Sequence, residues 1–515
     1  MPVPRLAQFA HIVATLLVLI ASVRIIATYK VLSNTTDEPA HLAAGMEWLQ
    51  GGTYTYEDQH PPLARVLGAT GLYLAGSRWG HDPEMYNEGF HLLGYGHHYA
   101  RNLFYSRLAM LPLFWIACAV VFLGSRRLAG PACAILATLI FTTVPAVLGH
   151  AGLVTTDMAL TAFTGAATLC AVYWAERPDW MRSVAFGLLT ALAVLSKFSA
   201  LLFLPPALLA LYGVHLAQTR PSFGTALREI RIRILPALLS VAVSAGAIEA
   251  AYRFSFGSVP LLHLRFPAPA FFNGIYAVWE HNREGHPAWL LGTLSQHGFW
   301  YYYPVVAAVK TPLALLMLTA AGLILIPRRV AVPLAFSVAI AIVASFGSIN
   351  IGIRHILPVY LGLSVCGGIV AVHLWQRLGR AGQGIAVLLL AWQLVSGARQ
   401  HPDYIAYTNE LAGDRPDRIL ADSDLDWSQD MKRLADRMYQ LGVPEFTFKI
   451  STPGYLAAGN NFPRFVQMPD GDYPRPGWNA VSITPWRIFG QPRWPEHIAP
   501  TERIGHSILL YYFPE

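Results

Sequence analysis

Residues 9–41 read FAHIVATLLVLIASVRIIATYKVLSNTTDEPAH, and this stretch decides the fold. The run from Phe9 to Tyr29 is mostly apolar, and a helix of roughly 20 apolar residues crosses a bilayer core about 30 Å thick. The run lacks a small-residue cleavage site and leads directly into a polar segment, so we interpret it as a retained span rather than a signal peptide. The stretch therefore predicts a membrane protein whose first polar segment begins at a membrane surface.

Most of the remaining chain has the same apolar character. Of its 515 residues 54% are hydrophobic and 13% are charged, whereas an average soluble domain has about 25% charged residues. The composition and the recurring apolar runs predict an α-helical polytopic membrane protein with about eleven transmembrane helices. We place them at residues 9–29, 103–124, 131–148, 157–175, 184–196, 199–217, 234–253, 299–326, 331–348, 356–374 and 383–398.

The formal charge of +7 comes from short basic clusters between the apolar runs. Scattered clusters do not form the single basic face that nucleic-acid binding requires. They fall in alternate connections: Arg126 and Arg127; Arg177 and Arg182; Arg220, Arg228, Arg231 and Arg233; Arg328 and Arg329; Arg377 and Arg380. The positive-inside rule makes these connections cytoplasmic, so residues 30–102, 254–298 and 399–515 are predicted to lie outside.

The last part of the chain differs in composition from the rest. From Arg399 onward it is polar and proline-rich, and it is long enough for a small domain. Helical spacing over residues 428–441 and short strand patterns at 446–450, 480–483 and 508–513 predict an α/β fold. We therefore expect a transmembrane domain over residues 1–398 and a soluble extracytoplasmic domain over residues 399–515. The four cysteines lie inside apolar runs and show neither disulfide nor zinc spacing.

The first outer segment, residues 30–102, carries the first candidate residues. Asp37 and Glu38 directly follow the first span, although Asp37 would also suit the cap of a helix that begins nearby. His60 stands before two prolines and a second short helix, where it could equally be a packed polar residue.

Further candidates stand at the outer ends of later spans. Asp157 begins the fourth span, where a capping role is again open. Lys197 and the pair Arg354 and His355 lie at span ends, where a cation can also extend toward lipid headgroups. Lys310 lies near the middle of the eighth predicted span, and an intramembrane charge is a functional hypothesis by default.

The predicted topology brings these acids and cations to one membrane face. A carboxylate there can take the proton of an acceptor hydroxyl, and cations can stabilise a departing phosphate. The combination suits attack by a hydroxyl on a carbon that bears a phosphate leaving group. The converging residues are Asp37, Glu38, His60, Asp157, Lys197, Arg354 and His355.

The chain resembles the GT-C superfamily of membrane glycosyltransferases. Within it, the resemblance is to the glycosyltransferase family 39 group, which includes protein O-mannosyltransferases and, more distantly, bacterial aminoarabinose transferases. It runs over nearly the whole length. It is carried by Asp37-Glu38, His60 to Leu63, Thr156-Asp157, Arg354 to Pro358, and the stretches 401–413 and 422–430.

The resemblance implies a GT-C fold and inverting transfer from a polyprenyl-phosphate sugar to a protein, glycan or lipid acceptor. It further implies a bacterial inner membrane, with the site facing the periplasm or exterior. Asp37 would be the base, Glu38 a neighbour that binds the acceptor or tunes the base, and Asp157 a wall of the cavity. The implied phosphate partners are Arg354, His355, Lys197, Lys310 and His60, and the implied acceptor or cavity residues are His41 and Arg65.

Other interpretations remain open at this stage. The acid-rich stretch from Asp422 to Asp430 could hold a divalent cation, but polar turn residues before a helix need no ion, and the expected reaction requires no cofactor. Secondary transporters and lipid flippases also contain many spans with intramembrane charge, yet this sequence shows no paired halves. A scaffold that only binds partners would leave the converging acids and cations unexplained.

Overall fold

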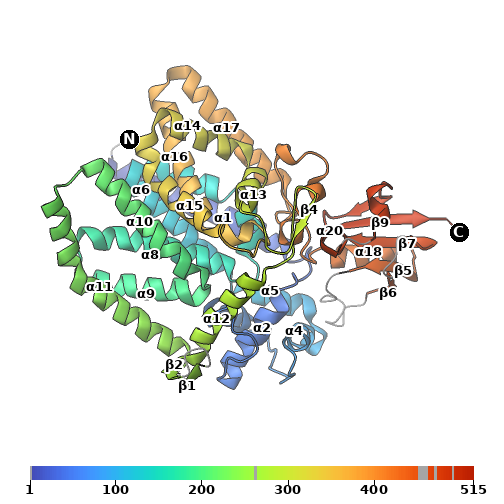
Figure 1. Ribbon diagram of the computed structural model, residues 1–515. Helices are drawn as coiled ribbons and strands as arrows, with labels where there is room; N and C mark the ends of the chain where they lie inside the picture. The colour runs from blue at the N-terminus through green and yellow to red at the C-terminus, as the bar shows by residue number, and fades with distance from the viewer. Residues whose placement is uncertain (1–2, 260–263, 451–461, 469–472, 490–491, 515) are drawn as a thin grey trace.

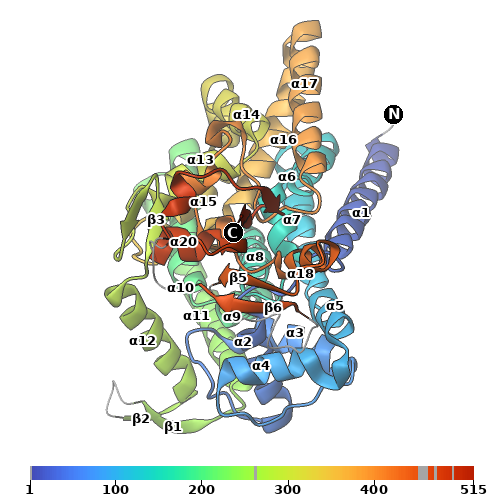
Figure 2. The same cartoon turned by 90° about the vertical axis from the view of Figure 1, so that its right-hand side faces the viewer.

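Figure 1 shows the computed structural model of the chain, which describes residues 3–259, 264–450, 462–468, 473–489 and 492–514. A large helical body carries a small sheet-containing unit at the carboxyl-terminal end of the chain (Figures 1 and 2).

Long apolar helices form the body. They are α1 (Val3–Thr28), α6 (Leu111–Phe141), α8 (Asp157–Glu176), α9 (Trp180–Ser196), α10 (Ser199–Thr219), α11 (Phe223–Ala251), α13 (Tyr302–Lys310), α14 (Leu313–Leu325), α15 (Pro327–Ala344), α16 (Val359–Arg377) and α17 (Gly379–Arg399). Within the described ranges, eight helices are long and apolar enough to cross a membrane, and a bent pair raises the number to nine. The prediction of a polytopic helical membrane protein is confirmed.

The eleven predicted segments exceed the eight or nine helices that pass the length test, and two places account for the difference. The continuous piece Tyr99–Phe141 has 43 residues, which corresponds to about 65 Å of helix and twice the bilayer core. Its backbone leaves helical geometry at Ala129 and Gly130, between the predicted spans 103–124 and 131–148. Helix α9 has 17 residues and is short but apolar.

The eighth predicted span, residues 299–326, is not one straight helix. Helices α13 and α14 meet at an angle of 114°. Thr311 between them has an extended backbone, as expected for a residue before proline, and Pro312 lacks the N–H that would continue the helix. Lys310 therefore lies at the break between the two helices, buried inside the protein.

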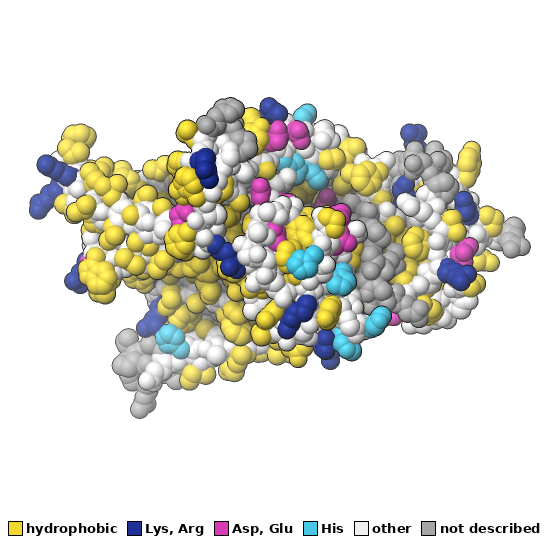
Figure 3. Space-filling view, turned by 90° about the horizontal axis from the view of Figure 1, so that it is seen from below, with side chains coloured by type: hydrophobic (Ala, Val, Ile, Leu, Met, Phe, Trp, Pro, Cys, Tyr) yellow, Lys and Arg dark blue, Asp and Glu magenta, His cyan; other side chains and the backbone are white. Residues whose placement is uncertain are grey.

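The arginine-rich connections meet at one end of the bundle. Arg127 forms an ion pair with Glu176, and Arg233 Nε donates to the carbonyl oxygen of Ala175 over 3.1 Å. In Figure 3, Lys and Arg side chains lie at the left end of the molecule and also over its middle and right end. The connections that carry Arg127 and Arg233 are thus close to the end of α8 and to each other.

Short helices and hairpins cover the opposite end. The first outer segment folds into α2 (Glu38–Met46), α3 (Pro62–Leu74), α4 (Met85–Gly94) and α5 (Tyr99–Leu108), and α7 (Pro145–Ala151) precedes α8. The second outer segment forms the hairpin β1 (Phe256–Val259) and β2 (Leu264–Pro267), helix α12 (Pro269–Glu284), and the hairpin β3 (Ala288–Leu290) and β4 (Thr293–Ser295).

The carboxyl-terminal unit is a mixed five-stranded sheet in the order β6-β5-β7-β9-β8. Its elements are α18 (Met431–Gln440), β5 (Glu445–Lys449), β6 (Arg464–Gln467), β7 (Gly477–Ser482), α20 (Ile483–Phe489), β8 (Glu502–Ile504) and β9 (Ile508–Phe513). Apolar residues of α18, among them Met431 and Leu434, pack on Phe446 and Phe448 of β5. The predicted helix and the three predicted strands are all present, while residues 404–425 pack into the core of the helical body.

Candidate active site

Asp37 lies at the outer end of the bundle, just before α2. It occupies the position of a helix cap, yet its side chain makes no capping hydrogen bond. Its carboxylate instead accepts a hydrogen bond from Arg354 Nη1 at 3.1 Å, and the Asp37 side chain is 29% exposed. The structure therefore favours the functional interpretation of Asp37 over the capping one.

Glu38, the next residue, is fully buried and points elsewhere. Arg107 binds both of its carboxylate oxygens, at 2.9 and 2.7 Å, and the backbone N–H groups of Thr35 and Val154 donate to it at 2.7 and 3.0 Å. Burial alone would raise the pKa of Glu38, but Arg107 and these hydrogen bonds outweigh burial and lower it. Glu38 thus fixes the loop that carries Asp37, and its geometry leaves it no free oxygen for a substrate.

Asp157 and Lys197 form a buried pair beside Arg354. Lys197 Nζ donates to Asp157 Oδ1 at 2.7 Å, and Arg354 Nη1 lies 3.7 Å from Asp157 Oδ2. Burial lowers the pKa of Lys197, although the charge of Asp157 opposes that shift. One buried carboxylate therefore holds two cations together at the ends of three distant helices.

Arg354 is positioned by a short 3-10 turn, Ile353–Ile356, and by the carboxyl-terminal segment. Its Nε donates to Ser423 Oγ at 3.0 Å, and its guanidinium lies 4.1 Å from the centre of the Trp427 ring. Gly352 precedes the turn with φ at +124°, and a Cβ on it would lie 2.6 Å from Ser423 Oγ. Only glycine fits this close approach without strain.

The same carboxyl-terminal segment also holds the loop of Asp37. The N–H of Thr36 donates to the carbonyl oxygen of Trp427 at 3.1 Å, and the N–H of Ser33 donates to that of Gln429 at 3.0 Å. Residues 423–429 therefore contact both the loop before Asp37 and Arg354. The sequence marked this stretch as part of the family resemblance and as a possible metal ligand set, but it gave Ser423 and Trp427 no role at the site.

The acids of this segment are mostly engaged by protein donors. Asp424 accepts from the N–H of Ile353 at 3.0 Å, Asp426 from Ser482 Oγ at 2.6 Å, and Asp430 from Ser507 Oγ at 2.8 Å. Throughout the described part of the chain, no group of three or more His, Cys, Asp or Glu side chains is arranged to hold a metal ion. These acids serve as anchors for the loop.

Asp422 is the exception among them. It is only half-buried, and burial raises its pKa to about 7, while Arg354 opposes and Asp37 adds to the shift. It therefore lies within electrostatic reach of both central residues of the site. No pattern in the sequence separated Asp422 from its acidic neighbours.

Lys310 is held by backbone carbonyl groups. Its ammonium group donates to the carbonyl oxygens of Ile405 at 2.6 Å and Asp424 at 2.5 Å. These two carbonyls belong to the segment that follows the last transmembrane helix. Lys310 ties that segment to the helix break, and its role as a phosphate partner stays a prediction.

The His60, His41 and Arg65 group forms a layer next to the site. Arg65 is buried and donates to His41 Nδ1 at 3.0 Å, and it forms an ion pair with Glu57. His60 Nδ1 lies 3.1 Å from Glu57 Oε2, and the rings of His41 and His60 are 5.1 Å apart. Arg65 and His41 are occupied by each other, so of the three only His60, 30% exposed at its side chain, adjoins open space.

The histidines of the site are neutral rather than cationic. Burial lowers the pKa of His60 to about 4, and Lys197 adds to this effect. Burial also holds the pKa of His355 well below its ordinary value, with Lys197 and Arg354 acting in the same direction. At neutral pH the fixed positive charges of the site are those of Arg354 and Lys197, so the histidines can only exchange hydrogen bonds.

Two further residues that the sequence did not indicate face the same charges. Burial and then Asp37 raise the pKa of Tyr86 on α4 to about 12. Burial lowers the pKa of His286, which Asp37 and Arg354 also influence. Both residues come from outer segments without a recognisable motif. Figure 3 shows histidine and acidic side chains around the middle of this face of the molecule.

This arrangement has two partly exposed carboxyl groups, Asp37 and Asp422, together with two cations and several neutral hydrogen-bonding groups. A carboxylate can accept a proton from a hydroxyl, and the two cations can stabilise charge on a phosphate oxygen. The geometry thus suits transfer of a group away from a phosphate.

Comparison with known proteins finds one partial family match and two proteins of similar fold. Residues 14–246 match the sequence model of the family described as dolichyl-phosphate-mannose-protein mannosyltransferase. No curated protein sequence matches the chain. The fold is similar to two crystal structures of ArnT from Cupriavidus metallidurans, one bound to undecaprenyl phosphate and one in the apo state, with TM-scores of 0.52 and 0.53. Each shares 13% identity, and each match covers 97% of this chain and 99% of that chain.

The family match covers the amino-terminal part, and the similarity to ArnT covers almost the whole chain and concerns its fold. The chain is therefore a multi-pass helical membrane protein with an ArnT-like fold, and its amino-terminal part is similar to the mannosyltransferase family.

Proposed function

We propose that this protein transfers a sugar from a polyprenyl-phosphate carrier to an acceptor hydroxyl, with Asp37 as the catalytic base. One observation carries the proposal. Asp37 and Arg354 are 317 positions apart in the sequence, yet their side chains are in contact at 3.1 Å. A base for the acceptor and a cation for the leaving phosphate therefore share one site.

The reaction has a simple atomic balance. The acceptor oxygen attacks the anomeric carbon while the bond from that carbon to the phosphate oxygen breaks, and the electron pair leaves with the phosphate. Asp37 takes the proton of the attacking hydroxyl. Attack from the side opposite the phosphate inverts the configuration at the anomeric carbon.

Arg354 plays two roles in succession. Without donor it pairs with Asp37, so that carboxylate is occupied. The phosphodiester of the donor carries one negative charge and offers Arg354 another partner, which gains a second charge as the sugar leaves. Donor binding thus releases Asp37 toward the acceptor. Lys197, already held by Asp157, supplies the second positive charge at the phosphate.

The polyprenyl carrier is supported by the fold. One of the similar ArnT structures is bound to undecaprenyl phosphate, and a phosphate at Arg354 would leave a lipid tail room only among the membrane helices. Because the arginine-rich connections lie at the end opposite the site, we place the site on the periplasmic or outer side of a bacterial inner membrane.

The acceptor is a protein, glycan or lipid hydroxyl. The description of the matched family supports a protein hydroxyl, and the neutral histidines and Tyr86 near Asp37 can orient any hydroxyl by hydrogen bonds. The transfer requires no cofactor, because two side-chain cations already balance the leaving phosphate.

The test is transfer by the purified protein from a panel of polyprenyl-phosphate sugars to peptide, glycan and lipid acceptors, with products identified by mass. We expect one donor to give a product heavier by one sugar and the Asp37→Asn variant to give none. Counterflow of a substrate without a covalent product would support a transporter and contradict the proposal.

A further inference from the structure

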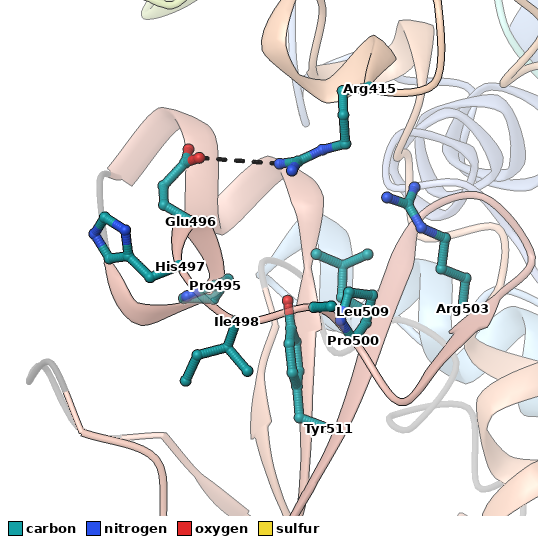
Figure 4. Close-up of a pocket in the computed structure, with 10 residues that line it drawn as sticks. Arg415, Pro495, Glu496, His497, Ile498, Pro500, Arg503, Leu509 and Tyr511 are labelled. Atoms are coloured by element: carbon teal, nitrogen blue, oxygen red, sulfur yellow. Dashed lines mark ion pairs between the residues drawn. The ribbon is translucent and has the colours of Figure 1, made fainter.

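A separate cavity of about 300 Å³ lies on the carboxyl-terminal unit. Figure 4 shows that strands β8 and β9, the segment 495–500 and Arg415 surround it. It shares no residue with the group around Asp37 and Arg354. Nothing in the proposed transfer uses it.

The charged groups of this cavity leave positive charge without a counterion. Its one carboxylate, Glu496, forms an ion pair with Arg487 and lies 3.9 Å from Arg415 (Figure 4). Arg503 also lines the cavity. It is exposed and, among the residues that the structure describes, no ion pair with it is found within 4.0 Å.

The neighbouring carboxylate cannot neutralise Arg503. Glu502 accepts from Arg437 Nε at 2.9 Å, on the side of the sheet where α18 lies. The side chain of Arg503 therefore extends toward the cavity with its charge available to a ligand (Figure 4).

A buried hydroxyl group points to the same ligand chemistry. Tyr511 lines the cavity and is only 1% exposed, yet its hydroxyl has no hydrogen-bond partner in the described part of the chain. Burial raises the pKa of Tyr511, and Arg415 and Arg503 oppose the shift, so both guanidinium groups are near this hydroxyl. Buried hydroxyl groups without a partner are rare, because the lost hydrogen bond is costly.

We propose that this cavity binds the anionic group of an acidic or phosphorylated sugar. The Tyr511 hydroxyl and the guanidinium groups of Arg415 and Arg503 donate to its carboxylate or phosphate oxygens. Pro495 and Pro500 offer apolar surface to the sugar ring. The volume is at the lower end of that of small-molecule sites, which suits a single sugar unit.

The cavity is linked to the active site through a short stretch of chain. Arg415 Nε donates to Asp417 Oδ1 at 3.0 Å, and the chain then runs directly to Asp422 beside Arg354. The bound sugar would thus be part of an acceptor glycan. This identification of the ligand as acceptor rests on the proposed function, whereas binding itself does not.

The test is binding of glucuronic acid, glucose 6-phosphate, glucose and inorganic phosphate to the full-length protein in detergent, measured by calorimetry without any donor. We expect one of the two sugar anions to bind at least tenfold more tightly than glucose or inorganic phosphate. Preference for glucuronic acid would assign a carboxylate, and preference for glucose 6-phosphate would assign a phosphate. Equal binding of glucose, or of inorganic phosphate alone, would overturn the proposal.

Variants make the test specific to this cavity. Arg503→Gln and Tyr511→Phe should each weaken binding of the preferred sugar anion by at least tenfold, and Tyr511→Phe keeps the aromatic ring that packs on Trp494. Arg464→Gln, which removes an exposed arginine elsewhere on the sheet, should leave binding unchanged. Equal weakening by all three variants would contradict the proposal. Because no donor is present, failure here is distinct from failure of sugar transfer.

Discussion

Two acid-rich segments meet at the site and use their carboxylates differently. In the first outer segment, Asp37 is partly exposed while Glu38 is enclosed by Arg107 and two backbone amides. In the carboxyl-terminal segment, Asp424, Asp426 and Asp430 are enclosed in the same way, and Asp422 alone is half-buried. Each segment thus combines carboxylates that anchor the chain with one that faces the site. A carboxylate that is partly exposed can take part in the reaction. A carboxylate that is buried and fully hydrogen-bonded stabilises the fold, although the residue type is the same.

The largest expected effect is the loss of sugar transfer when Asp37, rather than Glu38, is the acid that acts as the base. Asp37→Asn should lower the rate of sugar transfer by about 10²–10⁴-fold, the usual contribution of a general base. The variant should fold normally because the side chain is partly exposed. Transfer from radiolabelled carrier measures the rate, and Asp436→Asn, at an exposed carboxylate on α18, is a control that should transfer normally. Equal rates for Asp37→Asn and the wild type would remove the proposed base.

The next effect separates the same two acids by stability. Glu38→Gln leaves the buried Arg107 without its counter-charge, and breaking such a buried pair costs about 3–5 kcal/mol. Thermal unfolding in detergent should show a large fall in midpoint for Glu38→Gln and almost none for Asp37→Asn. If both variants unfolded at the same temperature, the assignment of Glu38 as a structural anchor and of Asp37 as the base would be wrong.

A smaller effect concerns the pH dependence of stability that the half-buried Asp422 of the second segment causes. The pKa of Asp422 is raised from 3.8 to about 7 by burial, so the folded state holds a proton that the unfolded state releases. This carboxyl group therefore costs stability increasingly as pH rises from about 4 to about 7. The stability of Asp422→Asn relative to the wild type should increase over that interval and then level off. Unfolding at several pH values measures the difference in stability between Asp422→Asn and the wild type. If that difference did not change with pH, the raised pKa of Asp422 would be contradicted.

The smallest expected effect is that of metal removal. The acids of the second segment are bound by protein donors such as Ser482 and Ser507, so a chelator should leave the transfer rate unchanged. Loss of transfer in EDTA, restored by magnesium, would show that these acids hold an ion.

Much of this fold could be predicted from the sequence because membrane crossing imposes a strong local signal. The break at Pro312 was missed because the apolar pattern continues through it. The convergence of Asp37, Asp157, Lys197 and Arg354 followed from topology alone. The roles of Lys310 and Glu38 could not be predicted from topology, because a buried charge depends on partners that are distant in sequence, such as Arg107 for Glu38. Ser423 and Trp427 carry no chemical signature of their own, and only the fold brings them to Arg354.

The central claim is that Asp37 and Arg354 exchange partners when the carrier phosphate arrives. Its most direct test is the affinity for undecaprenyl phosphate of the wild type, Asp37→Asn and Arg354→Gln, with Arg464→Gln as control. We predict that Asp37→Asn binds at least as tightly as the wild type because its arginine is released. Arg354→Gln should bind about tenfold more weakly or worse, since it loses charged hydrogen bonds. Weakened binding by Asp37→Asn, or unchanged binding by Arg354→Gln, would contradict the shared site.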